Sequence, residues 1–260
     1  MINWIKKIIF KLGGINAYTQ FYYLKKRNDI KKKVFSEPEI DIFKHFIKNG
    51  DDVFDIGSNY GHLAVVFSQL TPKGKVFAFE PIPFTYAVNA KIIAHFKATN
   101  VQLFNLGVGE KPEVVEFKVP TLDFGAPDTG LAFNGKRKFL EHQNFIQVQA
   151  KIESLDAFIA HEVNNLSFVK IDIEGAEYFA LKGMSQLLEK FKPTVFIEVC
   201  PEYIEGFGLT TLDLDNFLIN ELGYLAFLLE EKLVPKTHLE NANYLLIHSS
   251  KVEHFKHLIK

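Results

Sequence analysis

Short apolar runs and amphipathic stretches alternate along most of the 260-residue chain. The apolar runs have the length of buried strands, and the stretches between them repeat apolar residues at helical spacing. The pattern predicts strands over residues 52–56, 75–79, 101–106, 146–150, 166–173, 194–199, 224–229 and 244–248, with a short extended segment over 114–119. It predicts helices over residues 36–48, 63–70, 84–96, 155–160, 176–191 and 211–222. This alternation indicates an α/β fold with a doubly wound, mostly parallel sheet.

Two segments depart from the alternation. Residues 120–145 are polar and contain three glycines. A loop of this length in a compact domain is typically a lid or a substrate-binding loop, and we expect one of these here. Residues 1–35 form a basic, amphipathic N-terminal segment. We therefore predict one domain over residues 36–260, preceded by that segment.

Charge is distributed unevenly along the chain. Residues 1–33 carry a net charge of +8, from nine Lys or Arg and Asp29, whereas the remainder carries 21 basic and 30 acidic residues. A basic segment on an acidic body indicates contact with an anionic surface. The segment is too short and too charged to span a bilayer, and it lacks the features of a signal peptide. Two interpretations stay open: a helix packed on the domain, which we favour, and an interfacial helix on an anionic membrane.

Cysteine usage bears on the compartment. Cys200 is the one cysteine of the chain, so neither an internal disulfide nor a cysteine zinc cluster can form. This fits a reducing compartment, and we expect a cytoplasmic protein, membrane-peripheral if residues 1–33 bind lipid. We do not expect nucleic acid as a partner, because the basic residues gather in one terminal segment without a recognised binding motif. The sequence predicts no oligomeric state.

The first predicted strand ends in a glycine-rich turn, Asp55-Ile-Gly57-Ser-Asn59-Tyr-Gly61. Its glycines would let a ligand approach the backbone closely. The spacing differs from the G-x-G-x-x-G of dinucleotide sites, and the acid before the turn favours a cationic or zwitterionic ligand over a phosphate. Glu80 ends the second strand and fits an acid that accepts hydrogen bonds from ribose hydroxyls. The two features together predict a nucleoside site at the carboxyl ends of the strands.

Further acids follow later strands of the predicted sheet. Asp172, Glu174 and Glu177 lie close together in the sequence, and Glu198 ends another apolar run. Buried carboxylates at strand ends are costly unless they bind something. Glu174 and Glu177 would share a face if a helix had already begun, whereas an acid in a first helical turn is explained by the helix macrodipole. Three carboxylates could hold Mg²⁺, but such sites often need substrate oxygens too, and we predict no metal site.

The order and spacing of these motifs resemble those of the FkbM-type S-adenosylmethionine-dependent methyltransferases. The resemblance covers about residues 50–200, and its most specific part is Lys-Ile-Asp-Ile-Glu-Gly-Ala-Glu at 170–177. The other matching motifs lie at residues 55–61, 78–81, 107–110, 154–156 and 194–199. The resemblance implies a Rossmann-like class I methyltransferase fold, with a seven-stranded sheet whose last strand is reversed. It also implies S-adenosylmethionine as the cofactor and O-methylation of a sugar or natural-product hydroxyl.

The resemblance also implies roles for residues by position. The expected cofactor-binding residues are Asp55, Gly57, Ser58, Asn59, Gly61, Glu80, Pro81, Gly107, Val108 and Asp172. Asp55, Gly57 and Asn59 would hold the methionyl part of the cofactor, and Glu80 its ribose. Gly107 and Val108 would lie near the adenine, and Asp172 would face the methyl group. Ser58 and Tyr60 depart from the family, which commonly has Ala and an apolar residue there.

Methyl transfer to a hydroxyl needs alignment and a general base, but no covalent nucleophile. We expect Asp172 or Glu174 to be the base, with Glu198 as the next candidate. His142 in the long loop and His62 after the turn are more simply explained as exposed residues. Two other functions stay open: an NAD(P)-dependent oxidoreductase, which the glycine spacing disfavours, and a non-catalytic nucleoside-binding module. The sequence does not distinguish a sugar, a lipid-linked glycan or a polyketide as the acceptor.

Overall fold

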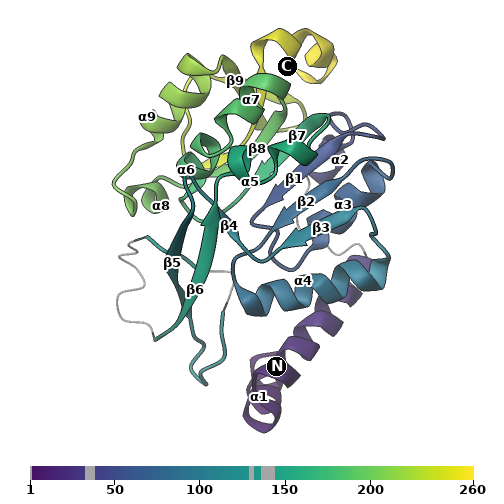
Figure 1. The fold of residues 1–260 in the computed structure, drawn as a ribbon, viewed down its shortest axis with the longest axis vertical. Helices are drawn as coiled ribbons and strands as arrows, with labels where there is room; N and C mark the ends of the chain where they lie inside the picture. The colour runs from purple at the N-terminus through teal and green to yellow at the C-terminus, as the bar shows by residue number, and fades with distance from the viewer. Residues whose placement is uncertain (1, 33–38, 129–131, 136–143) are drawn as a thin grey trace.

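A computed structural model describes residues 2–32, 39–128, 132–135 and 144–260 (Figure 1). Within these residues, eight strands form a central sheet in the order β10-β9-β11-β8-β7-β1-β2-β3. The strands are β1 (Asp52–Ile56), β2 (Val76–Phe79), β3 (Val101–Phe104), β7 (Leu166–Ile171), β8 (Thr194–Val199), β9 (Tyr224–Leu229), β10 (Leu233–Lys236) and β11 (Ala242–His248). β3, β2, β1, β7 and β8 pair in parallel, so their carboxyl ends meet at the same edge of the sheet. The predicted α/β fold is therefore confirmed.

The direction of the last strand identifies the type of sheet. β11 lies between β8 and β9 and is antiparallel to both, as the reversed last strand of a class I methyltransferase fold should be. β10 adds an edge strand beyond β9 that the sequence analysis missed. It is four residues long and contains Pro235, which has no N–H to donate to a ladder and is tolerated at an edge.

Alternate residues of the central strands fill two cores, one on each face of the sheet. In β1, Val53 packs with the core under α2 (Ile40–Phe43) and α3 (His62–Leu70), whereas Phe54 packs with the opposite core. In β7, Phe168 packs with the core under α2 and α3, and Val169 packs with the opposite core. The opposite core is covered by α5 (Leu155–Phe158), α6 (Glu177–Lys182), α7 (Ser185–Phe191), α9 (Thr211–Leu214) and the π-helical η4 (Asp215–Glu221). The described residues also include two 3-10 helices, η3 (Ala160–Glu162) and η5 (Ser249–Leu258), and the α-helix α8 (Pro201–Glu205).

A second, smaller sheet projects from the carboxyl edge of the first (Figure 1). It consists of β4 (Gly107–Val108), β5 (Glu113–Pro120) and β6 (Phe145–Glu153), in the order β4-β6-β5. The expectation that residues 146–150 continue the main sheet was wrong. β6 pairs antiparallel with β5 over eight residue pairs, and most of its side chains are exposed or half-buried, unlike those of the central strands. The residues between β5 and β6 are described at 121–128, 132–135 and 144.

Two predicted helices differ from the structure. The stretch 176–191 is divided into α6 and α7 by Met184, whose φ of −130° is not helical. Beside it, Gly183 packs so closely that an added Cβ would collide with the backbone oxygen of Gly109. Of the stretch 36–48, residues 36–38 lie outside the described residues, and α2 is the helical part of the remainder.

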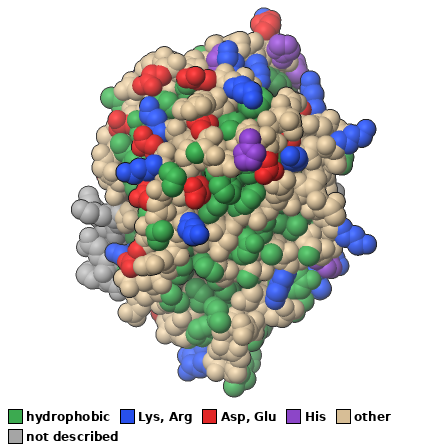
Figure 2. All heavy atoms as spheres, viewed as in Figure 1, with side chains coloured by type: hydrophobic (Ala, Val, Ile, Leu, Met, Phe, Trp, Pro, Cys, Tyr) green, Lys and Arg blue, Asp and Glu red, His purple; other side chains and the backbone are tan. Residues whose placement is uncertain are grey.

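The N-terminal segment folds into one long, kinked helix, α1 (Ile2–Lys31). The kink lies at Gly14, whose φ of 59° and ψ of −155° are not helical. The second half of α1 packs on α4 (Pro83–Phe96), and the first half lies at the lower tip of the molecule (Figure 1). Figure 2 shows hydrophobic and basic side chains at the same tip. Among the described residues, no helix has the length and apolarity needed to cross a bilayer.

Candidate active site

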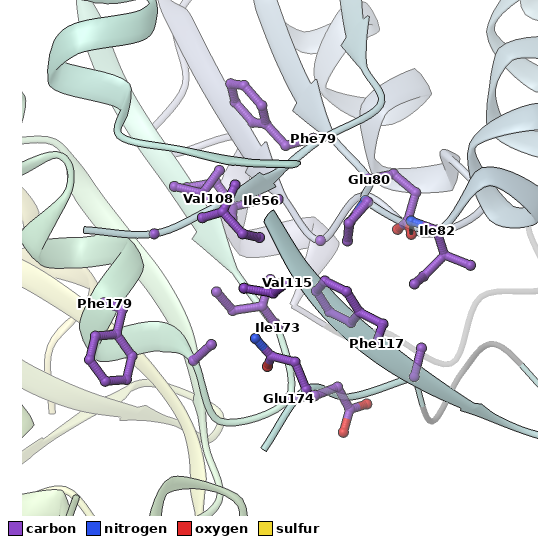
Figure 3. A pocket seen from close by; sticks show the side chains of 18 of the residues that line it. Ile56, Phe79, Glu80, Ile82, Val108, Val115, Phe117, Ile173, Glu174 and Phe179 are labelled. Atoms are coloured by element: carbon purple, nitrogen blue, oxygen red, sulfur yellow. Dashed lines mark hydrogen bonds between the residues drawn. The ribbon is translucent and has the colours of Figure 1, made fainter. Parts of the chain in front are cut away.

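A cavity of about 520 Å³ opens where the carboxyl ends of the central strands meet the small sheet. This volume lies within the usual range for a small-molecule or cofactor site. The wall is built by the ends of β1, β2, β7 and β8, by β4 and by β5. Figure 3 shows Val115 and Phe117 of β5 between Glu80 on one side and Phe179 on the other. The strand-end location agrees with the position predicted from the sequence.

The glycine-rich turn forms the floor of the cavity at the end of β1. Backbone N–H groups of Gly57 and Ser58 donate to the Phe79 carbonyl, at 3.1 Å and 2.9 Å, which ties the turn to β2. Gly57 has a φ of 75°, and an added Cβ would collide with the Asp172 carbonyl. A glycine is therefore required at this position for conformation and for space. Gly57 and Asn59 line the cavity.

The rest of the turn is held from behind by α4. Gly61 has a φ of 83° and lies against the amide of Asn89, so an added Cβ would collide with it. The Asn89 amide donates to the Ser58 hydroxyl at 2.9 Å and to the Asn59 carbonyl at 3.0 Å. Ser58 and Gly61, which we predicted to bind the cofactor, do not line the cavity. Both residues face α4, so in this structure they hold the turn in its conformation.

Glu80 is buried at the cavity wall and accepts two backbone hydrogen bonds. Its Oε2 accepts from Asn59 N at 3.0 Å, and its Oε1 accepts from Ile82 N at 2.9 Å. Burial raises the pKa of Glu80 to about 7, although these two N–H groups and the Lys170 ammonium favour the charged form. A carboxylate held by backbone in this way is preorganised to accept hydrogen bonds from a ligand. Pro81, Gly107 and Val108, from the predicted set, also line the cavity.

A buried lysine joins the turn to the strand that carries Asp172. Lys170 Nζ donates to the Gly57 carbonyl at 2.9 Å and lies 3.3 Å from Asp172 Oδ2 and 4.0 Å from Asp55 Oδ1. Asp55 is 0% exposed and does not line the cavity, although we expected it to hold the cofactor. The structure places it behind the turn, facing Lys170. The sequence analysis assigned no role to Lys170, yet a lysine in the middle of an apolar strand was a signal for a buried ion pair.

The three predicted base candidates, Asp172, Glu174 and Glu198, all line the cavity. Glu198, at the end of β8, shares a hydrogen bond with the Asp172 carboxylate. Burial, and then the negative charge of Asp172, raise the pKa of Glu198 to about 8. A carboxyl group with such a pKa is a stronger proton acceptor than an ordinary glutamate. Glu198 can therefore exchange a proton near neutral pH.

Glu174 and Glu177 do not share a helix face, because Glu174 lies before the start of α6. Glu174 has a φ of 62° and precedes α6, which begins at Glu177. The Oε1 of Glu177 accepts from Ile173 N and from Gly175 N, both at 3.1 Å, so its carboxyl closes the loop before α6. Burial raises the pKa of Glu177 to about 7. Among the described residues, no group of three or more His, Cys, Asp or Glu is arranged to hold a metal ion.

Two further segments close the cavity from above, one within the expected loop 120–145 and one after α8 that was not predicted from the sequence. Phe207, after α8, packs against Phe179 with ring centroids 5.9 Å apart and an interplanar angle of 57°, and it also packs against Gly135. Ala132 and Asn134 contribute from the segment that pairs with β5 through Lys118 and Phe133. Part of the predicted loop 120–145 thus lines the cavity, as a lid or substrate loop would. His142 lies outside the described residues, and His62 begins α3 without lining the cavity.

Comparisons with known proteins agree with this geometry. The family model of the methyltransferase FkbM domain matches residues 55–226. A protein named Methyltransferase 1 from Beauveria bassiana (strain ARSEF 2860) is 24% identical over 164 residues, which are 58% of this chain and 66% of that protein. A crystal structure of a methyltransferase FkbM from Methylobacillus flagellatus KT has a TM-score of 0.50 at 18% identity, over 78% of this chain and 44% of that one. A putative methyltransferase from Streptococcus mutans, in complex with SAH, has a TM-score of 0.46 at 12% identity, over 82% and 97%. The chain thus spans less than two thirds of the first two proteins.

Proposed function

This chain belongs to the FkbM methyltransferase family, and we propose that it transfers a methyl group from S-adenosylmethionine to a hydroxyl oxygen of a sugar or natural-product-like acceptor. One observation carries the proposal. The same cavity holds a backbone-anchored carboxylate, Glu80, and a hydrogen-bonded pair of acids, Asp172 and Glu198. The first suits the recognition of a ribose, and the second suits the removal of a proton from an acceptor.

The residues around Glu80 fit a nucleoside cofactor. The Glu80 carboxylate has lone pairs left after it accepts from Asn59 and Ile82, and ribose hydroxyls can donate to them. Gly57 lets the turn pack against the Asp172 carbonyl, where an added Cβ would collide, and so keeps the floor of the cavity in this shape. Gly107 and Val108 offer an apolar surface for an adenine ring. When bound, the cofactor would supply an electrophilic methyl group on a sulfonium.

The two acids beside the turn have different parts. Asp172 lies 3.3 Å from the Lys170 ammonium. Burial and the negative charge of Asp172 raise the pKa of Glu198 to about 8, so the Glu198 carboxylate is a stronger base than an ordinary glutamate. We assign Glu198 as the general base and Asp172 as the neighbour that raises its basicity. Glu174, across the same cavity, is the remaining candidate.

The roof of the cavity supports a small acceptor with hydroxyl groups. Phe117, Phe179 and Phe207 provide apolar surface, as in most small-molecule sites. Asn134 and Glu174 add hydrogen-bonding groups that can pair with hydroxyls. Alignment of an acceptor oxygen with the methyl group needs positioning from several directions. A mixture of apolar and polar walls supplies such positioning.

Labelling of the product tests this proposal. The protein is incubated with S-adenosylmethionine that carries a deuterated methyl group and with fractionated small molecules and glycans, and the products are analysed by mass spectrometry. We expect the label in a methyl ether. Glu198→Gln should lower the rate of labelling about 10²-fold or more, whereas Glu202→Gln, at an exposed position in α8, should retain it. Label on nitrogen or carbon would overturn the assignment of an oxygen acceptor.

A further inference from the structure

The first half of α1 is folded back on the second half by the kink at Gly14. Phe10 and Tyr18 have ring centroids 5.5 Å apart, and Lys6 Nζ lies 5.3 Å from the centre of the Tyr22 ring. In a straight helix, eight residues span about 12 Å and sixteen span about 24 Å. The contacts therefore require a helical hairpin. Phe10 also touches Phe124, with centroids 6.2 Å apart, in the segment that follows β5.

The hairpin leaves one side of the first half in solvent. Trp4 is 66% exposed and Leu12 is 84% exposed, and Ile5 and Ile8 are also exposed. At 3.6 residues per turn, these four side chains lie within about 100° of one another around the helix. Phe10 and Lys6, which contact the second half, lie on the opposite side. The first half thus has one side packed on the protein and one apolar side that faces water; we call the latter the α1 apolar stripe.

Basic residues border the α1 apolar stripe. Lys7 and Lys11 are exposed and lie on one flank of it at helical spacing. The described part of the segment carries further basic residues and Asp29 as its acid, within a net charge of +8 for residues 1–33. An exposed apolar stripe beside lysines is the arrangement of helices that lie in the headgroup region of anionic bilayers. We propose that the first half of α1 docks the protein on an anionic lipid membrane, with Trp4, Ile8 and Leu12 inserted and Lys7 and Lys11 at the headgroups.

Charge and shape favour a membrane over other partners. A second copy of the chain would bring the same excess of positive charge against this one. A nucleic acid would pair with the lysines but would leave Ile8 and Leu12 in water, because phosphates give no apolar contact. An anionic bilayer satisfies both features of the stripe. The docking does not depend on the proposed methyl transfer, since none of these side chains lines the cavity.

The second half of α1 links this surface to the cofactor turn. Tyr22 stacks on Tyr60 with centroids 5.3 Å apart and an interplanar angle of 20°, and Lys26 lies 4.8 Å from the centre of the Tyr60 ring. Tyr60 is the residue between Asn59 and Gly61. This contact accounts for the aromatic residue where the family commonly has an apolar one. The docked helix is therefore fixed to the floor of the cavity, so the membrane and the cavity keep one relative orientation.

Trp4 is the one tryptophan of the chain and provides a direct reporter. Full-length protein is titrated with vesicles of phosphatidylcholine alone and with vesicles that also contain phosphatidylglycerol, and fluorescence and co-sedimentation are measured. We expect a blue shift of the emission and protection from a soluble quencher with the anionic vesicles. Both effects should decline at high salt, since ions screen the attraction.

Variants separate the apolar and the basic contributions while Trp4 is kept. Lys7→Gln with Lys11→Gln should weaken partitioning about 25-fold, at about a fivefold loss per lysine. Ile8→Ser with Leu12→Ser should weaken it at least tenfold. The matched controls are Lys111→Gln with Lys236→Gln, and Val114→Ser with Leu212→Ser, at exposed positions elsewhere, and should change it less than twofold.

Several outcomes would overturn the docking proposal. Equal partitioning to neutral and anionic vesicles would remove the role of the lysines, and an absence of any fluorescence change would remove the insertion. A Trp4 response to single-stranded RNA without a response to vesicles would assign the surface to nucleic acid. A dimer in sedimentation that Ile8→Ser with Leu12→Ser dissociates would assign it to a second copy. Vesicle binding without any binding of S-adenosylmethionine would leave this proposal standing and contradict the proposed function.

Discussion

Burial raises the pKa of three acids at or beside the cavity, Glu80, Glu177 and Glu198. Glu80 is the acid that we expect to bind the cofactor, with a pKa of about 7 in the free protein. Ribose hydroxyls donate to its charged form, so protonation must oppose binding. We expect the affinity for S-adenosylmethionine to fall roughly tenfold from pH 8 to pH 6. Isothermal titration calorimetry over this range measures the change.

Glu80→Gln tests the same residue without a titratable group. The amide of Gln would place a donor against Asn59 N or Ile82 N, so the variant loses an acceptor and disturbs the turn. We expect affinity at pH 8 to fall at least tenfold, as for other hydrogen bonds to charged groups, and to lose most of its pH dependence. Glu110→Gln, an exposed change near β4, should behave like the wild type. Unchanged affinity in Glu80→Gln would contradict the ribose assignment.

The raised pKa of Glu198 leads to a prediction for how turnover depends on pH. A base must be deprotonated to act, so a pKa of about 8 means that turnover rises as pH increases from 6 to 9. Asp172→Asn removes the nearest negative charge, so the rise should shift to lower pH. Glu198→Gln should lower turnover about 10²-fold or more, measured as S-adenosylhomocysteine formed with the identified acceptor. A flat profile, or Glu198→Gln with normal turnover, would leave Glu174 as the base.

Glu177 gives a prediction for stability. Its pKa is about 7 in the folded protein against 4.5 as the ordinary value, so the folded state holds the proton more tightly. Its contribution to stability is complete below pH 4.5 and is lost as pH rises through 7, by at most about 3 kcal/mol. Glu177→Gln keeps an acceptor for Ile173 N and Gly175 N and cannot ionise. Relative to the wild type, it should therefore be more stable at pH 8 than at pH 5.

Urea unfolding at the two pH values measures this difference. Glu189→Gln, an exposed change in α7, is the matched control and should show no such difference. If the stability of Glu177→Gln relative to the wild type is the same at both pH values, the raised pKa is wrong.

Among the helices and strands, the break between α6 and α7 lies beside the wall of the cavity. Asp156 accepts from Gln186 N at 2.9 Å and from Leu187 N at 3.0 Å, so it caps the start of α7. Gly183 lies against the backbone of Gly109, which lines the cavity. Gly183→Ala should destabilise the protein by about 1–3 kcal/mol, as overpacking does, and weaken cofactor binding.

Thermal unfolding and calorimetry check this change together. Gln186→Ala, on the exposed face of α7, should leave both the melting temperature and the affinity nearly unchanged. If Gly183→Ala binds the cofactor with normal affinity, the packing at the helix break does not influence the cavity.

The same elements show how far the sequence determined the fold. β1, β8 and β9 have the predicted bounds, since buried strands between clear turns give unbroken apolar runs. We predicted β6 in the wrong sheet, because the local sequence pattern indicates that a strand is present but does not indicate which strand it pairs with. The division at Gly183 was missed for a similar reason. A glycine within a helical pattern is ordinary, and the close contact of Gly183 with Gly109, far away in the sequence, leaves no local signal.

In the whole molecule, the candidate site joins residues from the ends of four central strands, the small sheet and the segment after α8. The sequence predicted the floor and the acids, because parallel strands bring their carboxyl ends to one edge. It did not predict that Asp55 faces Lys170 behind the turn, nor that Phe207 closes the roof. Those positions depend on how distant segments pack. α1, placed against Tyr60, extends the same assembly to the surface that we propose to meet the membrane.

Calorimetry with the full chain measures which cofactor the cavity binds before any acceptor is known. The protein is titrated with S-adenosylmethionine, with S-adenosylhomocysteine and with NAD under the same conditions. We predict saturable binding of both S-adenosyl compounds and no binding of NAD, since the turn lacks the dinucleotide glycine spacing. Binding of NAD with no heat from millimolar S-adenosylmethionine would contradict the account.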